Sequence, residues 1–156
     1  MNSWLQAVRV GAETGICAAT IQACVGEAID GKLLPEGRLA DRAVGLLEAA
    51  LDEPREQKPT PPIFLSAAAF HFGYGAGWGA LYALARERLR VPALAAAALQ
   101  AAAIYTLAFS RVSAGVRLGS EPHPSRRRPG ELAFQLVMAG TFALSNAALY
   151  EAVRSR

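Results

Sequence analysis

Residues 59–85 read PTPPIFLSAAAFHFGYGAGWGALYALA, a run of 27 residues without Asp, Glu, Lys or Arg. A helix of about 20 apolar residues is long enough to cross the roughly 30 Å hydrocarbon core of a bilayer. Two more charge-free runs follow, residues 91–110 and residues 132–150. A buried helix of a soluble bundle is the alternative, but such a helix normally keeps a polar stripe for water. The three runs lack that stripe, so they predict membrane-spanning helices.

An earlier apolar segment is interrupted by Arg9 and Glu13. A signal peptide would explain an apolar N-terminal segment, but its apolar region tolerates an acid such as Glu13 poorly. We therefore interpret this segment as a further transmembrane helix. The sequence then predicts an all-α fold in one domain of 156 residues, a polytopic membrane bundle of four transmembrane helices. The expected spans are residues 4–26, 62–85, 91–111 and 132–150.

The long loop after the first span contains a further helical pattern. Between residues 38 and 52, Leu and Ala recur at spacings of three and four, opposite Arg42, Glu48 and Asp52. This spacing predicts an amphipathic helix. It could lie in the membrane interface or cap the bundle.

Glycines recur at helical spacing in the first two expected spans. Where a residue has no side chain, two helices can approach closely, which drives helix association in lipid. We expect these glycines to be packing residues, in the middle of the bundle or at an oligomer interface. They are Gly11, Gly15, Gly73, Gly75, Gly77 and Gly79.

Three intramembrane polar residues, Arg9, Glu13 and His71, fall inside the expected spans. A charge inside hydrocarbon costs roughly 2.5–3.5 kcal/mol on insertion scales, so such residues usually pair or line a path. Arg9 and Glu13 either form an ion pair near the interface or leave Glu13 as a functional acid. His71 is either a hydrogen-bonded packing residue or a proton carrier. Both Glu13 and His71 lie about 13.5 Å from the start of their spans, which predicts that they face each other.

The remaining polar residues of the spans are few. Gln22, Gln100, Gln135 and Asn146 are scattered one or two to a span, as expected of interhelical hydrogen-bonding groups.

The sequence contains few candidate groups for catalysis or metal binding. His123 lies between two prolines, and neither Cys17 nor Cys24 has ligand-like spacing to a histidine. The cysteines are expected to be buried thiols. No nucleophile–base pair, carboxylate dyad or phosphate loop is detectable. We expect no metal, no cofactor and no enzymatic activity.

Basic residues gather at the ends of the apolar runs. The run Arg126, Arg127 and Arg128 precedes the last span and is expected at the level of lipid headgroups, in contact with membrane lipids. The net charge is +3 and the pI about 9.2, but no basic stripe with interleaved aromatics appears, which argues against nucleic acid. Arginine and lysine are distributed over both sides of the expected bundle, so the membrane orientation stays open.

The order of these parts resembles a known family. The glycine-containing first span, Glu27, the turn Leu34-Pro35 with Arg38, and the second span with His71-Phe72-Gly73 and Ala80-Leu81-Tyr82 are similar to the YagU-like family of bacterial inner-membrane proteins. The resemblance covers about the first 90 residues and implies an inner-membrane location and a link to acid tolerance. The family's later histidines have no counterpart here, where Gln100 and Gln135 are the nearest polar residues.

Two functions follow as hypotheses. The first is a structural or accessory membrane subunit that packs against other membrane subunits or against itself. The second is a small transporter or proton-conducting protein that uses Glu13 and His71. The hypotheses differ in the surroundings of these two side chains, which either face a water-filled cavity or are enclosed by helix contacts.

Overall fold

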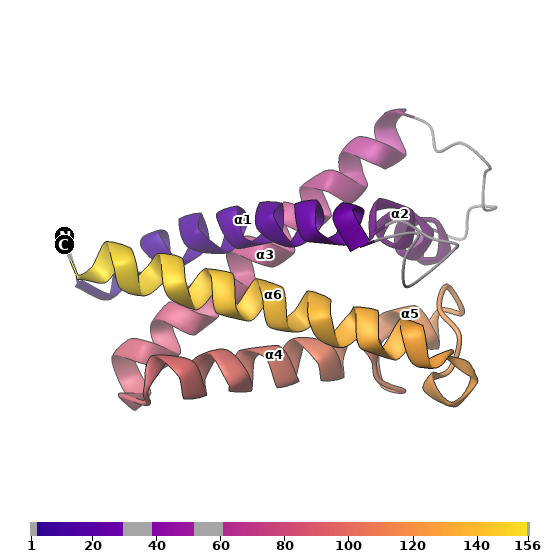
Figure 1. Cartoon of the computed structure of the whole chain (residues 1–156). Coiled ribbons are helices and arrows are strands. Elements are labelled where there is room, and N and C mark those ends of the chain that lie inside the picture. The colour runs from indigo at the N-terminus through magenta and orange to yellow at the C-terminus, as the bar shows by residue number, and fades with distance from the viewer. Residues whose placement is uncertain (1–2, 30–38, 52–60, 156) are drawn as a thin grey trace.

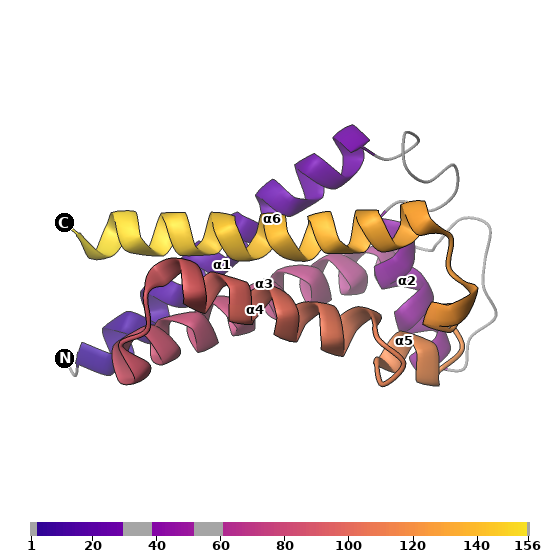
Figure 2. The same cartoon turned by 60° about the horizontal axis from the view of Figure 1, so that its bottom comes forward.

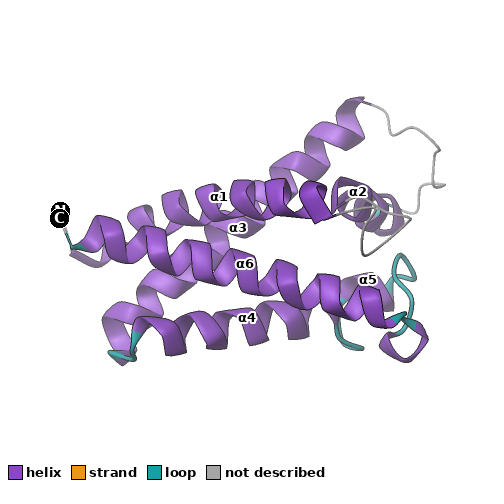
Figure 3. Cartoon of the chain, viewed as in Figure 1, coloured by secondary structure: helices purple, strands orange, loops and turns teal. Residues whose placement is uncertain are grey.

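The computed structural model describes residues 3–29, 39–51 and 61–155, and every regular element in them is a helix (Figures 1 and 3). The all-α prediction is therefore confirmed. Six α-helices and one short 3₁₀ helix occur in the described residues. They are α1 Ser3–Ile29, α2 Leu39–Ala50, α3 Pro61–Leu89, α4 Ala93–Phe109, α5 Ala114–Arg117, η1 Pro124–Arg126 and α6 Pro129–Arg154.

The four long helices, α1, α3, α4 and α6, form a bundle, and the two chain ends lie at the same end of it (Figures 1 and 2). α1 packs along α3 and α6, and α6 also packs along α4. α3 runs obliquely and diverges from α4, although the two helices are consecutive in the chain (Figure 1). The shorter helices α2, α5 and η1 lie at the opposite end of the bundle from the termini.

A three-residue turn, residues 90–92, connects α3 to α4. Arg90 has a φ of 52°, in the left-handed region that residues other than glycine rarely adopt. The Arg86 side chain donates a hydrogen bond to the carbonyl oxygen of Val91, which fixes the turn against the end of α3. Pro92 then precedes the first residue of α4.

The helices match the expected spans in position but not in length. The expected spans 4–26, 62–85 and 132–150 lie inside α1, α3 and α6, while the span 91–111 extends two residues beyond each end of α4. α2 lies inside the expected amphipathic segment, of which residues 38 and 52 are outside the described residues. Glu48, expected on its polar face, is buried instead, at 2% exposure.

Two helical stretches are long and apolar enough to cross a membrane by length and composition, Ala93–Arg117, which contains α4 and α5, and Pro129–Arg154, which is α6. Among the described residues, α1 and α3 do not meet this requirement.

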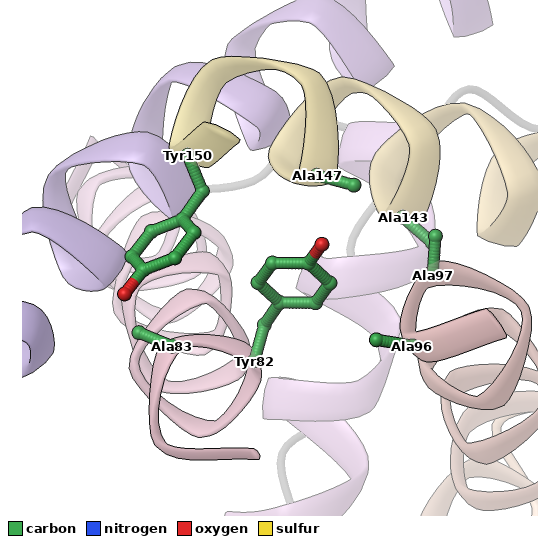
Figure 4. Packing of buried hydrophobic residues seen from close by; sticks show 7 residues of the cluster. All are labelled: Tyr82, Ala83, Ala96, Ala97, Ala143, Ala147 and Tyr150. Atoms are coloured by element: carbon green, nitrogen blue, oxygen red, sulfur yellow. The ribbon is translucent and has the colours of Figure 1, made fainter. Parts of the chain in front are cut away.

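The bundle interior is built from small side chains. At the end that holds the termini, the rings of Tyr82 and Tyr150 meet edge to face with centroids 5.6 Å apart (Figure 4). Alanines surround them and bring α3, α4 and α6 together. These alanines are Ala83, Ala96, Ala97, Ala143 and Ala147.

The middle of the bundle is packed in the same way, around Ala18, Ala19, Ile104, Ala139 and Phe142. Phe134 and Met138 fill the interior toward the start of α6, against Val25 and Ile29 of α1.

Candidate functional site

α1 and α3 cross with their backbones in contact. A Cβ atom built on Gly11 would lie 2.5 Å from the carbonyl oxygen of Gly79, and one on Gly15 would overlap the carbonyl group of Gly75. Real Cβ atoms do not approach other heavy atoms so closely, so these four positions require glycine. Since the two helices run in opposite directions, Gly11 and Gly15 meet Gly79 and Gly75, respectively, on successive turns.

The two other glycines predicted to pack lie elsewhere. A Cβ atom built on Gly73 or Gly77 would meet nothing within 4 Å. Both glycines are exposed, as are Phe70, Tyr74 and Leu81 on the same face of α3. The glycine-rich run therefore has one face turned into the bundle and one turned away from it.

A chain of hydrogen bonds links all four long helices through the interior. The Thr14 hydroxyl of α1 lies 2.9 Å from Asn146 Oδ1 of α6, and Asn146 Nδ2 donates to Gln100 Oε1 of α4 at 3.3 Å. Gln100 Nε2 donates to the Trp78 carbonyl oxygen of α3 at 2.9 Å. Thr14, Gln100 and Asn146 are 6%, 6% and 0% exposed. Because an unpaired polar group would be costly inside the bundle, this network favours one register of the four helices.

Further amides bond across the bundle. Gln22 Nε2 of α1 donates to the Met138 carbonyl oxygen of α6 at 2.9 Å. Gln135 of α6 accepts a hydrogen bond from Arg127 at 2.9 Å, so its partner is a loop residue and not another long helix. All four amides that the sequence singles out make a contact between elements.

Glu13 and His71 do not meet. The carboxylate of Glu13 lies 3.5 Å from Arg9 Nε of the same helix, and both side chains are more than half exposed. His71 Nε2 lies 3.3 Å from the Ala19 carbonyl oxygen. The glycine crossing sets the register of α1 and α3 so that His71 lies level with Ala19. Ala19 is six residues beyond Glu13, about 9 Å along the helix axis. The expectation that Glu13 and His71 face each other is therefore wrong.

Arg127 is turned into the protein. Its side chain is fully buried, and its Nη2 lies 3.0 Å from Glu121 Oε2. Nε donates to the Pro122 carbonyl oxygen at 3.1 Å, and Nη1 donates to the carbonyl oxygen of Phe109 and to Gln135 Oε1. A buried charge is tolerated when it is paired and its donors are satisfied in this way. The expectation that Arg127 contacts membrane lipids is therefore wrong, whereas its neighbours in the run, residues 126 and 128, are exposed.

An ionic cluster joins the ends of α3 and α6 beside the chain termini. Arg86 Nε lies 2.6 Å from Glu151 Oε1, and Arg154 Nε lies 3.2 Å from Glu87 Oε1. Tyr150 donates its hydroxyl proton to Glu87 at 3.2 Å. The hydrogen bond from Arg86 holds the pKa of Glu151 below its ordinary value, and the same bond raises the pKa of Arg86.

A cavity of about 240 Å³ lies between the diverging helices α3 and α4, at the end of the bundle that holds α2 and α5. Its apolar wall includes Phe70, Ile104, Leu107 and Phe109. Polar side chains from three different parts of the chain also line it. These are Gln22, His71, Tyr74, Ser120 and Glu121.

The described residues contain neither a metal site nor a disulfide. In the described ranges, no three His, Cys, Asp or Glu side chains gather closely enough to hold a metal ion. Cys17 and Cys24 are free and exposed on α1, so the expectation of buried thiols is wrong. Their positions on the outward face follow from the crossing, which turns Gly15 and Ala19 inward.

Sequence reasoning missed Thr14 and assigned Arg127 to the lipid headgroups instead of the protein interior. Thr14 could have been found, because it lies between Gly11 and Ala18 on the side of the helix that carries the glycines. Arg127 has no such signal, since it is flanked by Arg126 and Arg128 and only the path of the loop turns it inward.

Comparison with known proteins finds no family model that matches this chain and no curated protein or solved structure that is significantly similar to it.

Proposed function

We propose that this protein is a multi-pass integral protein of the bacterial inner membrane that serves as a structural or accessory subunit for other membrane proteins. In this proposal α1, α3, α4 and α6 are the four crossing helices. The observation that carries it is the distribution of leucine and alanine between the outside and the inside of the bundle.

Leucine is on the outside. Among the side chains that the structure describes, eleven leucines are exposed and none belongs to the buried core, of which nine of sixteen apolar residues are alanine. Leu94 and Leu65 are 73% and 66% exposed. Burying a leucine stabilises a protein in water by roughly 1.5–3 kcal/mol, so a soluble bundle would turn these residues inward. In lipid that force is absent, and small residues inside allow close helix packing.

The lengths of the helices and the placement of the chain ends support four crossings. α1, α3 and α6 have 27, 29 and 26 residues, and α4 has 17. At 1.5 Å per residue these helices are roughly 26–44 Å long, against a hydrocarbon core of about 30 Å. Both chain ends and the turn between α3 and α4 lie at one end of the bundle (Figure 2), as an even number of crossings requires. The inner-membrane location rests on the resemblance to the YagU-like family.

The accessory role rests on the outward face of α3. Gly73 and Gly77 leave the backbone uncovered there, between the exposed side chains of Phe70, Tyr74 and Leu81. A helix of another subunit could pack on this face as α1 packs on the opposite one. The transporter hypothesis needs Glu13 and His71 on one path, and their separate partners give it no support.

Two experiments test the two parts of this proposal. Carbonate extraction should leave the protein in the membrane fraction, and recovery without detergent in the soluble fraction would overturn the membrane location. Isolation from native membranes in mild detergent should recover a stoichiometric partner. The double variant Gly73→Leu/Gly77→Leu should lose that partner, while Gly140→Leu, at another open glycine position of α6, should keep it.

Two outcomes of the second experiment would contradict the accessory role or its docking surface. Isolation of a monomer, or of an oligomer of this chain alone, would overturn the accessory role. Equal retention of the partner by the double variant and by Gly140→Leu would show that the outward face of α3 is not the docking surface.

A further inference from the structure

The cavity between α3 and α4 has an apolar mouth and a more polar interior. Of the residues that line it, Phe70, Tyr74 and Leu107 are 43%, 37% and 56% exposed, and they mark its opening. The polar residues Gln22 and His71, together with the loop residues 120 and 121, are only half-exposed or less. A molecule that enters from the outside therefore passes aromatic and aliphatic side chains before it reaches hydrogen-bonding groups.

The hydrogen bonds already present in the cavity wall leave acceptors available. A carbonyl oxygen only accepts, so His71 Nε2 is the donor to Ala19, and a neutral imidazole then has its lone pair at Nδ1. By the same reasoning Gln22 turns its Nε2 toward the Met138 carbonyl oxygen, and its Oε1 is the remaining acceptor. The Ser120 hydroxyl donates to the Gly115 carbonyl oxygen at 3.2 Å. These contacts favour a ligand that brings its own hydrogen-bond donor.

The charges beside the cavity favour a neutral ligand. Glu121 lines the cavity, and its carboxylate is paired with Arg127 at 3.0 Å, so the pair carries no net charge. An anionic ligand would meet this carboxylate and the acceptors of His71 and Gln22. A cationic ligand would find no uncompensated negative charge, because the Glu121 carboxylate is already paired with the buried Arg127 guanidinium.

The volume sets the size of the ligand. An apolar protein cavity of about 150 Å³ accepts a benzene molecule. The 240 Å³ available here gives room for about two fused rings. Phe70 and Tyr74, whose ring centroids are 6.0 Å apart, and Phe109 supply aromatic surface for such rings.

We propose that this cavity is a binding site for a neutral, lipid-soluble aromatic alcohol of about two fused rings, whose hydroxyl group donates a hydrogen bond to Nδ1 of His71. The ring system occupies the apolar wall formed by α3 and α4. Phe70 and Tyr74 belong both to this cavity and to the outward face of α3, whereas Gly73, Gly77 and Leu81 of that face do not line the cavity. Binding of the ligand does not depend on an accessory role. Only the route of entry, from the lipid side between the two helices, rests on the proposed membrane location.

Equilibrium dialysis of 1-naphthol tests this site on the purified full-length protein in detergent micelles, with empty micelles as the reference. Beyond partition into micelles, saturable binding of one molecule per chain is expected. 1-Methylnaphthalene has the same ring system without the hydroxyl group, and it should bind about tenfold more weakly, the loss that one hydrogen bond accounts for. Uptake equal to that of empty micelles, or equal affinity for both probes, would overturn the proposal.

Variants locate the bound probe. His71→Phe keeps a ring and removes the acceptor, so the affinity for 1-naphthol should fall to that for 1-methylnaphthalene, which itself should not change. Ala108→Phe should fill the cavity and abolish binding of both probes, while Leu99→Phe, at an exposed position of α4 outside the cavity, should bind as the unmodified protein does.

Circular dichroism would show whether Ala108→Phe folds. If it does not, the affinities of the unmodified protein and of His71→Phe for the two probes still test the proposal. Unchanged 1-naphthol affinity in His71→Phe would overturn the assignment of the hydroxyl group to that residue.

Discussion

Gly15 of α1 lies directly against Gly75 of α3, so that a Cβ atom on Gly15 would overlap the Gly75 carbonyl group. One turn along, Gly11 and Gly79 are in the same relationship. This crossing fixes the register of α1 against α3. It places His71 level with Ala19 and leaves Glu13 on the outer surface.

Replacing Gly75 by leucine should destabilise the protein by about 1–3 kcal/mol or more, because the new side chain must force the two backbones apart. The midpoint of thermal unfolding in detergent, followed by circular dichroism, would measure this loss.

Gly77→Leu is the matched control, two residues away on the open face of the same helix. It should leave the unfolding midpoint unchanged or raise it, since leucine is a better helix former than glycine by about 1 kcal/mol. Similar losses in both variants would contradict the assignment of the two faces.

Replacing Arg127 by alanine should cost about 3–5 kcal/mol, the range for removing one partner of a buried ion pair. The loss arises because the Glu121 carboxylate and the carbonyl oxygens of Pro122 and Phe109 would lose their shared donor. Arg126→Ala, at the exposed neighbouring position, should change stability by less than about 0.5 kcal/mol. The unfolding midpoints of the two variants, compared under one condition, check this prediction, which a larger effect of Arg126→Ala would refute.

The interior network can be tested by a double-mutant cycle. Asn146→Leu and Gln100→Leu should each cost about 1–3 kcal/mol, because each leaves a buried partner without its hydrogen bond. Since the two residues bond each other at 3.3 Å, the double variant should cost less than the sum of the single variants. Thr20→Ala is a control, since the Thr20 hydroxyl bonds only the Ile16 carbonyl oxygen of its own helix. Strictly additive unfolding free energies would show that the network does not act as a unit.

The pair of Arg86 and Glu151 predicts a loss of stability in acid. Because the hydrogen bond from Arg86 lowers the pKa of Glu151 below the ordinary glutamate value of 4.5, the folded protein holds the ionised form more strongly than the unfolded chain does. The stabilisation is fully present above that ordinary value and disappears as the pH falls through the lower pKa of the folded state. Thermal unfolding midpoints measured between pH 7 and pH 3 should therefore decrease at the acidic end.

Glu151→Gln isolates this contribution from that of other carboxylates. Its unfolding midpoint should lie below that of the unmodified protein at pH 7, and the difference should shrink as the pH approaches 3. A difference that stays constant over this range would exclude ionisation of Glu151 as its cause.

Several features could be predicted from the sequence because they depend on local pattern. The charge-free runs predict the long helices α3, α4 and α6, and the Leu and Ala spacing predicts α2. The amides predict contacts between elements, since any polar side chain inside such a helix needs a partner nearby. The membrane location and the four crossings stay proposals, because only two helical stretches of the described residues are long and apolar enough to cross a membrane.

The sequence by itself determined that this chain is helical, which residues are small enough for close packing, and which polar groups need partners. These properties are set by helix periodicity and by the chemistry of single residues. Only the tertiary structure decided that Gly75 and Gly79 pack inside while Gly73 and Gly77 face outward, that His71 meets Ala19 and not Glu13, and that Arg127 is buried between two exposed arginines. The physical reason is that the two glycine-bearing faces of α3 are equivalent until a neighbouring helix covers one face. The register of that contact then sets which side chains of the two helices lie level with each other.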